Sequence, residues 1–344
     1  MDHYWDIIVQ SYTGYARYLW HEISHPGWHN YLLWLIGVSA FFLALEWWRP
    51  WRTQQKRFRQ DFWLDLFYLF FNFFLFALIV HNAASDVVVN LFNDTLRAGF
   101  GFDLRAMNPL EAAPYWCVLL VGFVVRDFVH WWIHRLLHYS PLLWRFHKVH
   151  HSVKEMGFAA HLRFHWMETV IYRTLEYVPL ALLGIGLYDF FVIHIFTLAV
   201  GHYNHSNLSL PTRHTGAVVG ALIGVGGVTL AGLPLPGGET SGWSITLASA
   251  AGGVAGWTLL SPVMKKIFNH PEMHIWHHAK DLPEERRLGV NFGLTLAVWD
   301  YLFKTAYVPH DGRDIALGFP GDDHFPRDFV GQSTYGFTKV RRQR

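Results

Sequence analysis

The chain has 344 residues, of which 52% are hydrophobic, 17% aromatic and only 16% charged, and its formal net charge is +2. This composition excludes an ordinary soluble enzyme, and the small net charge gives no reason to expect a nucleic-acid partner. The single cysteine, Cys117, excludes an intrachain disulfide and a thiolate-bound metal. We therefore expect an integral membrane protein in which any metal is held by nitrogen and oxygen.

The N-terminal part, residues 1–113, predicts two membrane-spanning helices joined by a basic loop. Tyr31–Trp47 and Phe62–Val80 are apolar runs close to the roughly 20 residues that a helix needs to cross a bilayer. The basic segment between them, Trp48–Arg59, is expected in the cytoplasm by the positive-inside rule. Met1–Gln10 has no basic region followed by an apolar run, so we expect no secretory signal.

A third span is predicted over Pro114–Ile133, running back to the cytoplasmic side. It contains Arg126 and Asp127, which are costly in lipid and should therefore face protein or a wet cavity. The segment that follows, Ser140–Glu168, is polar, aromatic and rich in histidine. We expect it to form cytoplasmic helices that lie over the membrane surface.

Two further apolar regions are interrupted. Tyr172–Val200 contains Pro179, Gly184 and Gly186, which favours a kinked hairpin or a re-entrant pair of helices. Thr215–Leu260 is rich in glycine and nearly uncharged, and it predicts two more spans with a turn at Leu233–Gly238.

Glycines in that last region repeat with the GxxxG spacing that lets helices approach closely in lipid. The two runs are Gly216, Gly220 and Gly224, and Gly252 and Gly256. The alternative is that glycine is simply frequent in membrane helices.

Histidines form three clusters: HxxxH, HxxHH and a second HxxHH. They comprise His134 and His138, then His147, His150 and His151, then His274, His277 and His278. Residues three and four apart share a face of an α-helix, so we expect each cluster to aim its nitrogens at one point. Two copies of HxxHH suggest two metal ions.

The donor set narrows the choice of metal. Imidazole suits iron, zinc, copper and nickel, but more than four nitrogen ligands exceed a tetrahedral structural zinc site. Octahedral iron with open positions fits better. His205 and His165 are further candidate ligands, each with a structural alternative. Metal-bound histidines usually donate their other N–H to a carboxylate or carbonyl, so Asp127, Glu168 and Asp300 are candidate outer partners.

Two other functions compete with this interpretation. His21, Glu22 and His25 match the HExxH pattern of zinc metalloproteases, but Pro26 disfavours a helix at His25 and the predicted topology places this motif opposite the other clusters. The same histidine clusters could also serve a non-catalytic metal-binding or transport protein. Metal flux across vesicles without O2 consumption would favour transport.

The chain resembles the sterol desaturase and fatty acid hydroxylase superfamily of membrane histidine-box di-iron oxygenases. The matching stretches run from Arg126 to about Phe319: RDFVHWWIHRLLH, LLWRFHKVHHS, LRFHWMETV, HSNLSLP, HPEMHIWHH and NFGLTLAVWDYLFKT. The resemblance implies an all-α, multi-pass transmembrane bundle with a cytoplasmic histidine-rich cap. It also implies that the eight clustered histidines are the catalytic metal ligands, with His205 matching the histidine before Ser-Asn.

The resemblance implies a catalytic domain over residues 114–319, followed by a cytoplasmic tail at 320–344. The chain departs from the family in an inserted glycine-rich pair of spans at about 212–262, and in Lys304, where a glycine is common. The insertion bears on substrate access and oligomeric state, and a homodimer stays open.

The expected activity is O2-dependent hydroxylation or desaturation of a lipid such as a sterol or a fatty acyl chain. The cofactors implied are two iron ions, with O2 as co-substrate. Electrons are expected from a separate donor of the cytochrome b5, ferredoxin or reductase type. We expect the chain in a bilayer, in a bacterial inner membrane rather than the endoplasmic reticulum, with its active site in the cytoplasm.

Overall fold

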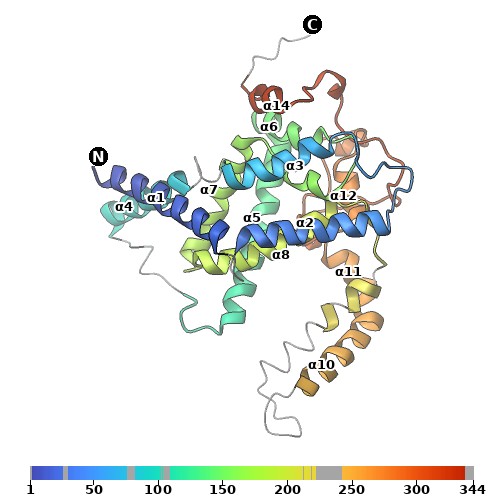
Figure 1. Cartoon of the computed structure of the whole chain (residues 1–344), viewed down its shortest axis with the longest axis horizontal. Helices are drawn as coiled ribbons and strands as arrows, with labels where there is room; N and C mark the ends of the chain where they lie inside the picture. The colour runs from blue at the N-terminus through green and yellow to red at the C-terminus, as the bar shows by residue number, and fades with distance from the viewer. Residues whose placement is uncertain are drawn as a thin grey trace.

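The computed structural model describes residues 2–25, 30–75, 82–101, 103, 109–211, 213–217, 219–221 and 242–337. Within these ranges the chain forms helices and loops, with two isolated bridges, Phe268 to Leu296 and Ala279 to Leu317, and no strand. The all-α prediction is therefore confirmed. Most helices gather around one centre, from which α10 and α11 extend away at the bottom of the view (Figure 1).

Among the described residues, three helical stretches are long and apolar enough to cross a membrane. They are α2 (Tyr31–Trp48), α5 (Tyr115–Tyr139) and Leu247–Ile267, which runs through α10 (Gly242–Ala255), η5 (Gly256–Leu260) and α11 (Ser261–Ile267). They correspond to the first and third predicted spans and to one of the inserted pair. The chain is a membrane protein.

The predicted second span begins as α3 (Phe62–Phe70) and continues as the π-helical η1 (Phe71–Leu75). The rest of that prediction, residues 76–80, lies outside the described residues. Beside this region, α1 (Asp2–Ser24) packs along α4 (Asn82–Phe100), and the Tyr4 hydroxyl donates to Asp94 (Figure 1).

The interrupted segment forms a helical hairpin, as predicted. It consists of α7 (Trp166–Leu182) and α8 (Leu187–His205), joined by a turn in which Gly184 has a φ of +75°. Glycine adopts this left-handed conformation at no steric cost. Pro179 lies inside α7 without ending it, so glycine rather than proline makes the turn.

The segment predicted to form helices over the membrane surface does form helices, and much of it is buried in the protein. It contains α6 (Pro141–His151) and the 3-10 helix η4 (Phe158–Leu162), all five of whose residues are buried. Its polar groups are paired inside the protein. For example, the Phe158 amide donates to Glu46 on α2, and Asn72 donates to the carbonyls of Leu162 and Phe164.

The C-terminal part closes over α5 and α6 with short helices and ordered loops. Its elements are α12 (Pro271–His277), η6 (Glu284–Arg286), α13 (Val298–Leu302), η7 (Asp322–His324) and α14 (Phe329–Tyr335). Trp131 on α5 donates to Asp300 on α13, and Asp127 accepts from the Trp299 indole. These contacts fix the C-terminal loops against the long helix.

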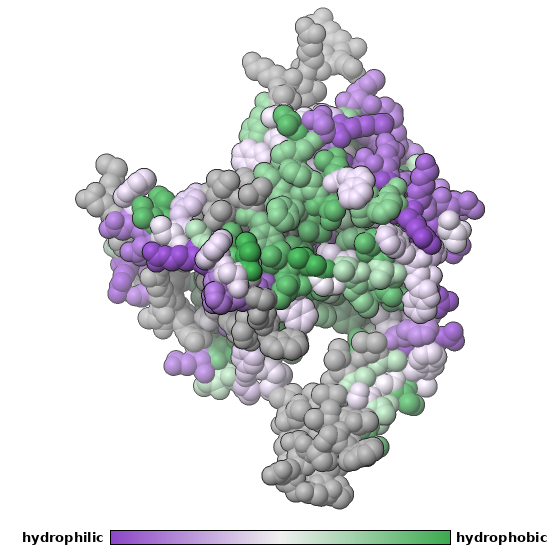
Figure 2. Space-filling model, in the orientation of Figure 1, coloured by the Kyte–Doolittle hydropathy of each residue, from purple (hydrophilic) through white to green (hydrophobic). Residues whose placement is uncertain are grey.

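A broad apolar surface lies over α2 and α3. Figure 2 shows hydrophobic residues across the middle of this face, with hydrophilic residues gathered along one edge. Large exposed side chains here include Trp34, Ile36 and Phe41 on α2, and Trp63 and Phe70 on α3. An apolar surface of this kind suits contact with lipid.

The glycine spacing does bring two helices into backbone contact. A Cβ on Gly220 would lie 2.1 Å from the Gly252 carbonyl oxygen, and one on Gly216 would lie 2.4 Å from the Gly256 carbonyl oxygen. Only glycine permits this separation, so the GxxxG interpretation is supported over mere abundance. Gly224 and the predicted turn at Leu233–Gly238 lie outside the described residues.

Candidate metal centre

The fold brings all eight clustered histidines to one place, and His205 joins them. They form two groups, within each of which the possible ligand nitrogens lie within 4.8 Å of one another. The five-histidine group consists of His134, His138, His147, His151 and His277, and the four-histidine group of His150, His205, His274 and His278. Helices α5, α6, α8 and α12 supply eight of them, and His278 directly follows the last residue of α12.

Each HxxHH motif is divided between the groups. In the first motif, His147 and His151 join the five-histidine group while His150 joins the other, and in the second motif only His277 joins the five-histidine group. The expectation that each cluster aims at one point is therefore wrong for both HxxHH motifs. Adjacent helical residues point about 100° apart, so two neighbouring histidines cannot face the same ion.

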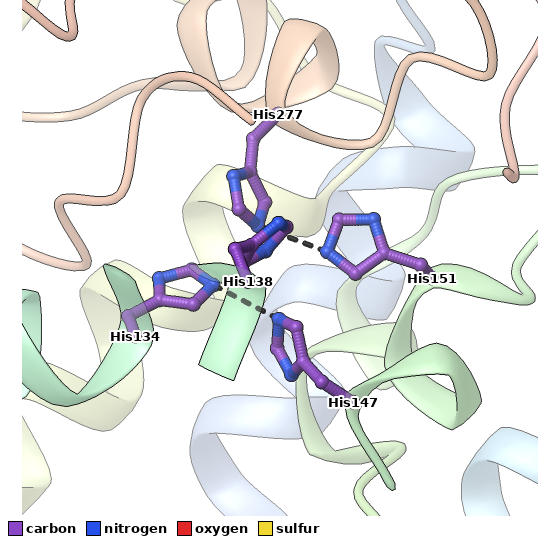
Figure 3. A group of neighbouring side chains, drawn as sticks. All are labelled: His134, His138, His147, His151 and His277. Carbon is purple, nitrogen blue, oxygen red and sulfur yellow. Dashed lines mark hydrogen bonds between the residues drawn. The ribbon is translucent and has the colours of Figure 1, made fainter. Parts of the chain in front are cut away.

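The Nε2 atoms converge on the middle of each group. In the five-histidine group, His134 and His147 lie 3.2 Å apart, and His151 and His277 lie 3.1 Å apart (Figure 3). In the four-histidine group, His205 Nε2 lies 2.9 Å from His274 Nε2 and 3.2 Å from His150 Nε2. Both groups thus present unshared imidazole nitrogens to a common point.

Several of the opposite ring nitrogens are held by protein acceptors. Nδ1 of His134 donates to the Phe292 carbonyl and Nδ1 of His277 to the Val290 carbonyl, both at 2.7 Å. Nδ1 of His147 lies 2.9 Å from Glu168 Oε1, and Nδ1 of His205 lies 2.8 Å from the Gly201 carbonyl. With the proton on Nδ1, the Nε2 lone pair is free to bind a metal ion.

Burial keeps these rings neutral. Desolvation, with a smaller contribution from neighbouring histidines, lowers the pKa of His150 and His151 well below the ordinary range. Burial likewise lowers the pKa of His277 to about 3, although its hydrogen bond to Val290 opposes the shift. A neutral imidazole is the form that binds metal.

The spacing of the nitrogens fits a metal ion. Two ligands at 90° around an ion about 2.1 Å from each lie about 3.0 Å apart, against about 3.4 Å for a tetrahedral ion. The observed pairs, at 2.9 to 3.2 Å, are close to these values, so the spacing suits a metal ion without choosing between the two geometries. In addition, His138 Nε2 is buried without a hydrogen-bond partner among the described residues, which an ion would resolve.

Parts of the chain are similar to known lipid-modifying proteins. A fatty acid hydroxylase family model matches residues 119–225. The chain is 27% identical to an ornithine lipid hydroxylase of Rhizobium tropici, over 65% of this chain and 52% of that protein. It is 25% identical to a methylsterol monooxygenase of Aspergillus fumigatus, over 43% and 45% of the two chains. A very-long-chain aldehyde decarbonylase of Oryza sativa subsp. japonica is 34% identical over 28% and 32%.

The chain is therefore similar to the sterol desaturase and fatty acid hydroxylase superfamily, and the family-model match lies over residues 119–225. It spans about half the length, or less, of these curated relatives. No solved structure matches it. The remaining residues of the site are therefore assigned from the geometry of this chain alone.

A loop at residues 289–296 supplies the carbonyls that hold His134 and His277, and sequence reasoning missed its central residue. Asn291 has a φ of +55°, is fully buried, and donates to the carbonyls of Met273 and Tyr307 while accepting from the Tyr307 amide. The sequence signal that could have identified it is the asparagine at the start of NFGLTLAVWDYLFKT, which is Asn291. Asparagine tolerates this left-handed conformation better than most residues.

Of the three predicted outer carboxylates, only Glu168 contacts a histidine of the two groups. Asp300 accepts from the amides of Phe292 and Gly293 and from Trp131, whereas Asp127 accepts from the amides of Thr295 and Leu296. These two therefore hold the 289–296 loop rather than a histidine. A carboxylate can satisfy several backbone donors of one loop, which a sequence does not reveal.

His165 lies outside both groups. Its Nδ1 accepts from the Met167 amide at the start of α7, its Nε2 lies 2.8 Å from the Ser333 carbonyl, and its ring packs on Phe146. Both nitrogens are therefore used, because the ring caps a helix and ties α14 to it. We do not retain His165 as a ligand.

The HExxH motif is also separate from the histidine groups. His21 and His25 stack with ring centroids 4.8 Å apart and are exposed at the end of α1, and no group of three metal-binding side chains among the described residues includes them. A metalloprotease site needs a third ligand and a shaped, water-excluding cavity. The structure gives no support for the protease alternative.

Two cavities reach the histidine core. An open cavity of about 400 Å³ contacts His138, His151 and His277 and has Trp144 and Leu288 among its walls. A second, smaller cavity contacts His130 and His161. The His130 ring lies 6.3 Å from that of His134, and the His161 ring 5.1 Å from that of His205. The second cavity therefore approaches both groups.

Proposed function

We propose that this chain is a membrane-bound non-haem di-iron oxygenase that hydroxylates, or desaturates, a lipid with O2 and an external reductant. The single observation that carries this proposal is the pair of adjacent, buried groups of five and four histidines. The relatives support it, since they are named as a lipid hydroxylase and a methylsterol monooxygenase. We favour hydroxylation because both names describe insertion of oxygen.

The residues fit two iron ions, one for each group. Imidazole is a ligand of iron, and five or four of them leave one or two positions of an octahedral ion for another ligand. When bound, the two irons would supply the activation of O2 that an unactivated C–H bond requires. The groups contain no carboxylate, so the ligands themselves are neutral.

The protein's own contribution is to orient the histidine rings before a metal binds and to bury most of them. Glu168 fixes the ring of His147, and the 289–296 loop fixes those of His134 and His277. Such outer contacts set ring orientation and tautomer before the metal binds. Eight of the nine rings are buried, which limits their contact with water, although an open cavity reaches His138, His151 and His277.

The basic loop supports a cytoplasmic site. Trp51 donates to the Asn207 carbonyl, Gln55 to that of Met156, and Arg59 to that of Gly157. Residues of this loop therefore pack against segments that flank the histidine core. If the positive-inside rule places the loop in the cytoplasm, the core lies near the same face. We accordingly propose a bacterial inner-membrane enzyme served by a separate electron donor.

The test is metal content, measured by mass spectrometry on protein purified in mild detergent, for the wild type and for His150→Ala/His277→Ala. This double variant removes one ligand from each group, so we expect about two irons per chain to be lost. The matched control, His21→Ala/His25→Ala, should keep its iron. Zinc that survives in the first variant and is lost in the control would overturn the proposal. O2 consumption and a lipid analysis of cells with and without the chain would then identify the substrate.

A further inference from the structure

Lys304 has an unusual backbone conformation and a side chain that contacts no other charged group. It directly follows Phe303 at the end of α13 with a φ of +59°, a left-handed conformation that residues other than glycine adopt at a cost. Glycine is the usual residue at this position after a helix. The Lys304 side chain is exposed, and no hydrogen bond or ion pair joins it to another described residue. A lysine held in this conformation without a partner inside the protein indicates a partner outside it.

Lys304 lines an open cavity of about 280 Å³ together with other charged side chains. Arg286 and Arg287 lie on the same wall, as do Glu284 and Glu285. Arg287 pairs with Glu284 at 2.7 Å, but the two side chains are 70% and 81% exposed, and such exposed pairs hold each other weakly. Three cations against two carboxylates give the cavity a net positive charge, which favours an anion.

A fourth cation, Arg135, lies at the edge of this cavity. Tyr139 is on the cavity wall, and Arg135 Cζ lies 5.0 Å from the centre of its ring. The same guanidinium lies 5.4 Å from the rings of Trp131 and Trp132. In the part of the chain that the structure describes, Arg135 has no carboxylate partner. The aromatic rings therefore hold the guanidinium in place while its N–H groups stay available to an anion.

Exposed apolar side chains adjoin these cations. On α13, Tyr301 is 43% and Leu302 65% exposed, and on α5, Trp132 is 45% and Leu136 48% exposed. Phe303 joins the two sets, because its ring lies 5.8 Å from that of Trp132. Cations beside exposed tryptophan, tyrosine and leucine are typical of a protein surface at a membrane interface. The name α13 patch is used below for Trp132, Arg135, Leu136, Arg286, Arg287, Tyr301, Leu302, Phe303 and Lys304.

The α13 patch lies at the end of a membrane span and beside the metal centre. Trp132 and Tyr139 are in the last turns of α5, which is one of the helices able to cross a membrane. The cavity of about 400 Å³ that reaches the five-histidine group shares Tyr139, Arg287 and Leu288 with the cavity at Lys304. The two cavities are therefore neighbours at the end of the span, where a bilayer surface lies.

We propose that the α13 patch binds the anionic headgroups of phospholipids at the bilayer surface. The cations of the patch donate to phosphate oxygens, and its aromatic and aliphatic side chains lie among the lipids at headgroup level. This contact seats the mouth of the 400 Å³ cavity on the membrane. It requires neither a bound metal ion nor catalysis, so it goes beyond the proposed oxygenase function and is tested separately from it.

The experiment uses the full chain purified in dodecyl maltoside, with phosphatidylglycerol as the anionic probe and phosphatidylcholine as the zwitterionic comparison. Thermal unfolding followed by tryptophan fluorescence reports binding, because a ligand of the folded state raises Tm in a saturable manner. We expect phosphatidylglycerol to bind at least about fivefold more tightly than phosphatidylcholine, with a preference that declines as salt is added. Inorganic phosphate, which has no acyl chains, should not stabilise the protein at the same concentration.

Lys304→Gly is the decisive variant, because the backbone and the charge predict opposite effects. Glycine accepts the left-handed conformation, so the Tm without lipid should stay equal or rise. Loss of the charge should nevertheless weaken binding of phosphatidylglycerol about fivefold. Lys304→Arg keeps the charge and should bind as the wild type does. Arg327→Asn is the matched control, since it removes one exposed positive charge outside the α13 patch.

Equal binding of phosphatidylglycerol by the wild type and Lys304→Gly would overturn the proposal, as would an equal loss in Arg327→Asn. Equal binding of the two lipids would also overturn it, and stabilisation by inorganic phosphate alone would mean a site for free phosphate instead. If binding depends on Lys304 in a protein that contains no iron, the α13 patch stands and the oxygenase proposal fails. If the protein contains iron but its lipid binding ignores Lys304, the oxygenase proposal stands and the patch proposal fails.

Discussion

The two histidine groups draw on the same motifs but differ in how their outer nitrogens are held. In the five-histidine group, the Nδ1 atoms of His134, His147 and His277 pair with a carbonyl or a carboxylate. In the four-histidine group, Nδ1 of His205 has such a partner, whereas His150 Nδ1 and His278 Nδ1 are buried without one among the described residues.

Carbonyl or carboxylate acceptors therefore hold three rings of the five-histidine group and one ring of the four-histidine group, in which Asn269 also lies 3.4 Å from His274 Nδ1. His150 packs on Phe164, with ring centroids 4.9 Å apart, and His205 packs on His161 at 5.1 Å. Hydrogen bonds fix both the tautomer and the ring orientation, whereas packing fixes the ring plane alone. We therefore expect the five-histidine group to bind its metal ion more tightly.

The largest effect is expected from removing one histidine from one group at a time. His277→Ala should lower affinity in the five-histidine group on the order of 100-fold or more, and His278→Ala should do so in the four-histidine group. Metal content should fall from about two ions per chain to about one in each variant. His324→Ala, at an exposed position outside both groups, is the control. Loss of all metal in either single variant would show that the two groups act as one site.

Much of this site was predictable from the sequence, because helical spacing is a local property. HxxxH places His134 and His138 on one face of α5, and both join the same group. The spans over α2 and α5 follow equally from apolar length. What could not be predicted is how α6 and α12 meet, because that depends on packing between distant segments. For that reason the division of each HxxHH motif was missed.

The supporting contacts were harder to predict for a different reason. A carboxylate near a histidine in sequence can pair with the ring, as Glu168 does, or with loop amides, as Asp300 does. Both residues are buried and both are hydrogen-bonded, so composition and spacing do not separate them. Only the path of the 289–296 loop decides, and that path depends on the unusual backbone of Asn291.

A smaller effect is expected from disturbing the packing that holds the four-histidine group. A Cβ at Gly201 would lie 2.1 to 2.8 Å from three atoms of the His161 ring, and the Gly201 carbonyl is the acceptor for His205. Gly201→Ala should therefore weaken the metal of this group by about 10- to 100-fold and spare the other. Gly37→Ala is the matched control, since a Cβ there meets nothing within 4 Å. If a chelator removed metal equally from both groups of Gly201→Ala, the two groups would not be held in place by separate contacts.

A variant of Glu168, which pairs with His147, tests the five-histidine group. Glu168→Gln keeps the size of the side chain but removes the charge that His147 faces, so we expect the metal of the five-histidine group to be bound about tenfold more weakly. Chelator titration followed by metal analysis should then show the two ions leaving at similar concentrations, rather than one after the other. Glu155→Gln, on the exposed side of the protein at the Gln60 amide, is the control. If Glu168→Gln changes nothing, hydrogen bonding does not set the difference between the groups.

The smallest effect on metal is expected from the glycine helix pair, which lies apart from both groups. Gly220→Ala would place a Cβ 2.1 Å from the Gly252 carbonyl oxygen and 2.7 Å from the Gly256 Cα, so the two helices must separate, at a cost of about 1–3 kcal/mol. Gly253→Ala, whose Cβ would meet only ordinary contacts at 3.6 and 3.7 Å, should cost nothing comparable. Thermal unfolding should distinguish these two variants while metal content stays equal to that of the wild type. If Gly220→Ala lost metal and Gly253→Ala did not, the helix pair would support the histidine core. Separating the two distant helices could change metal binding only if their packing helps to position the imidazoles.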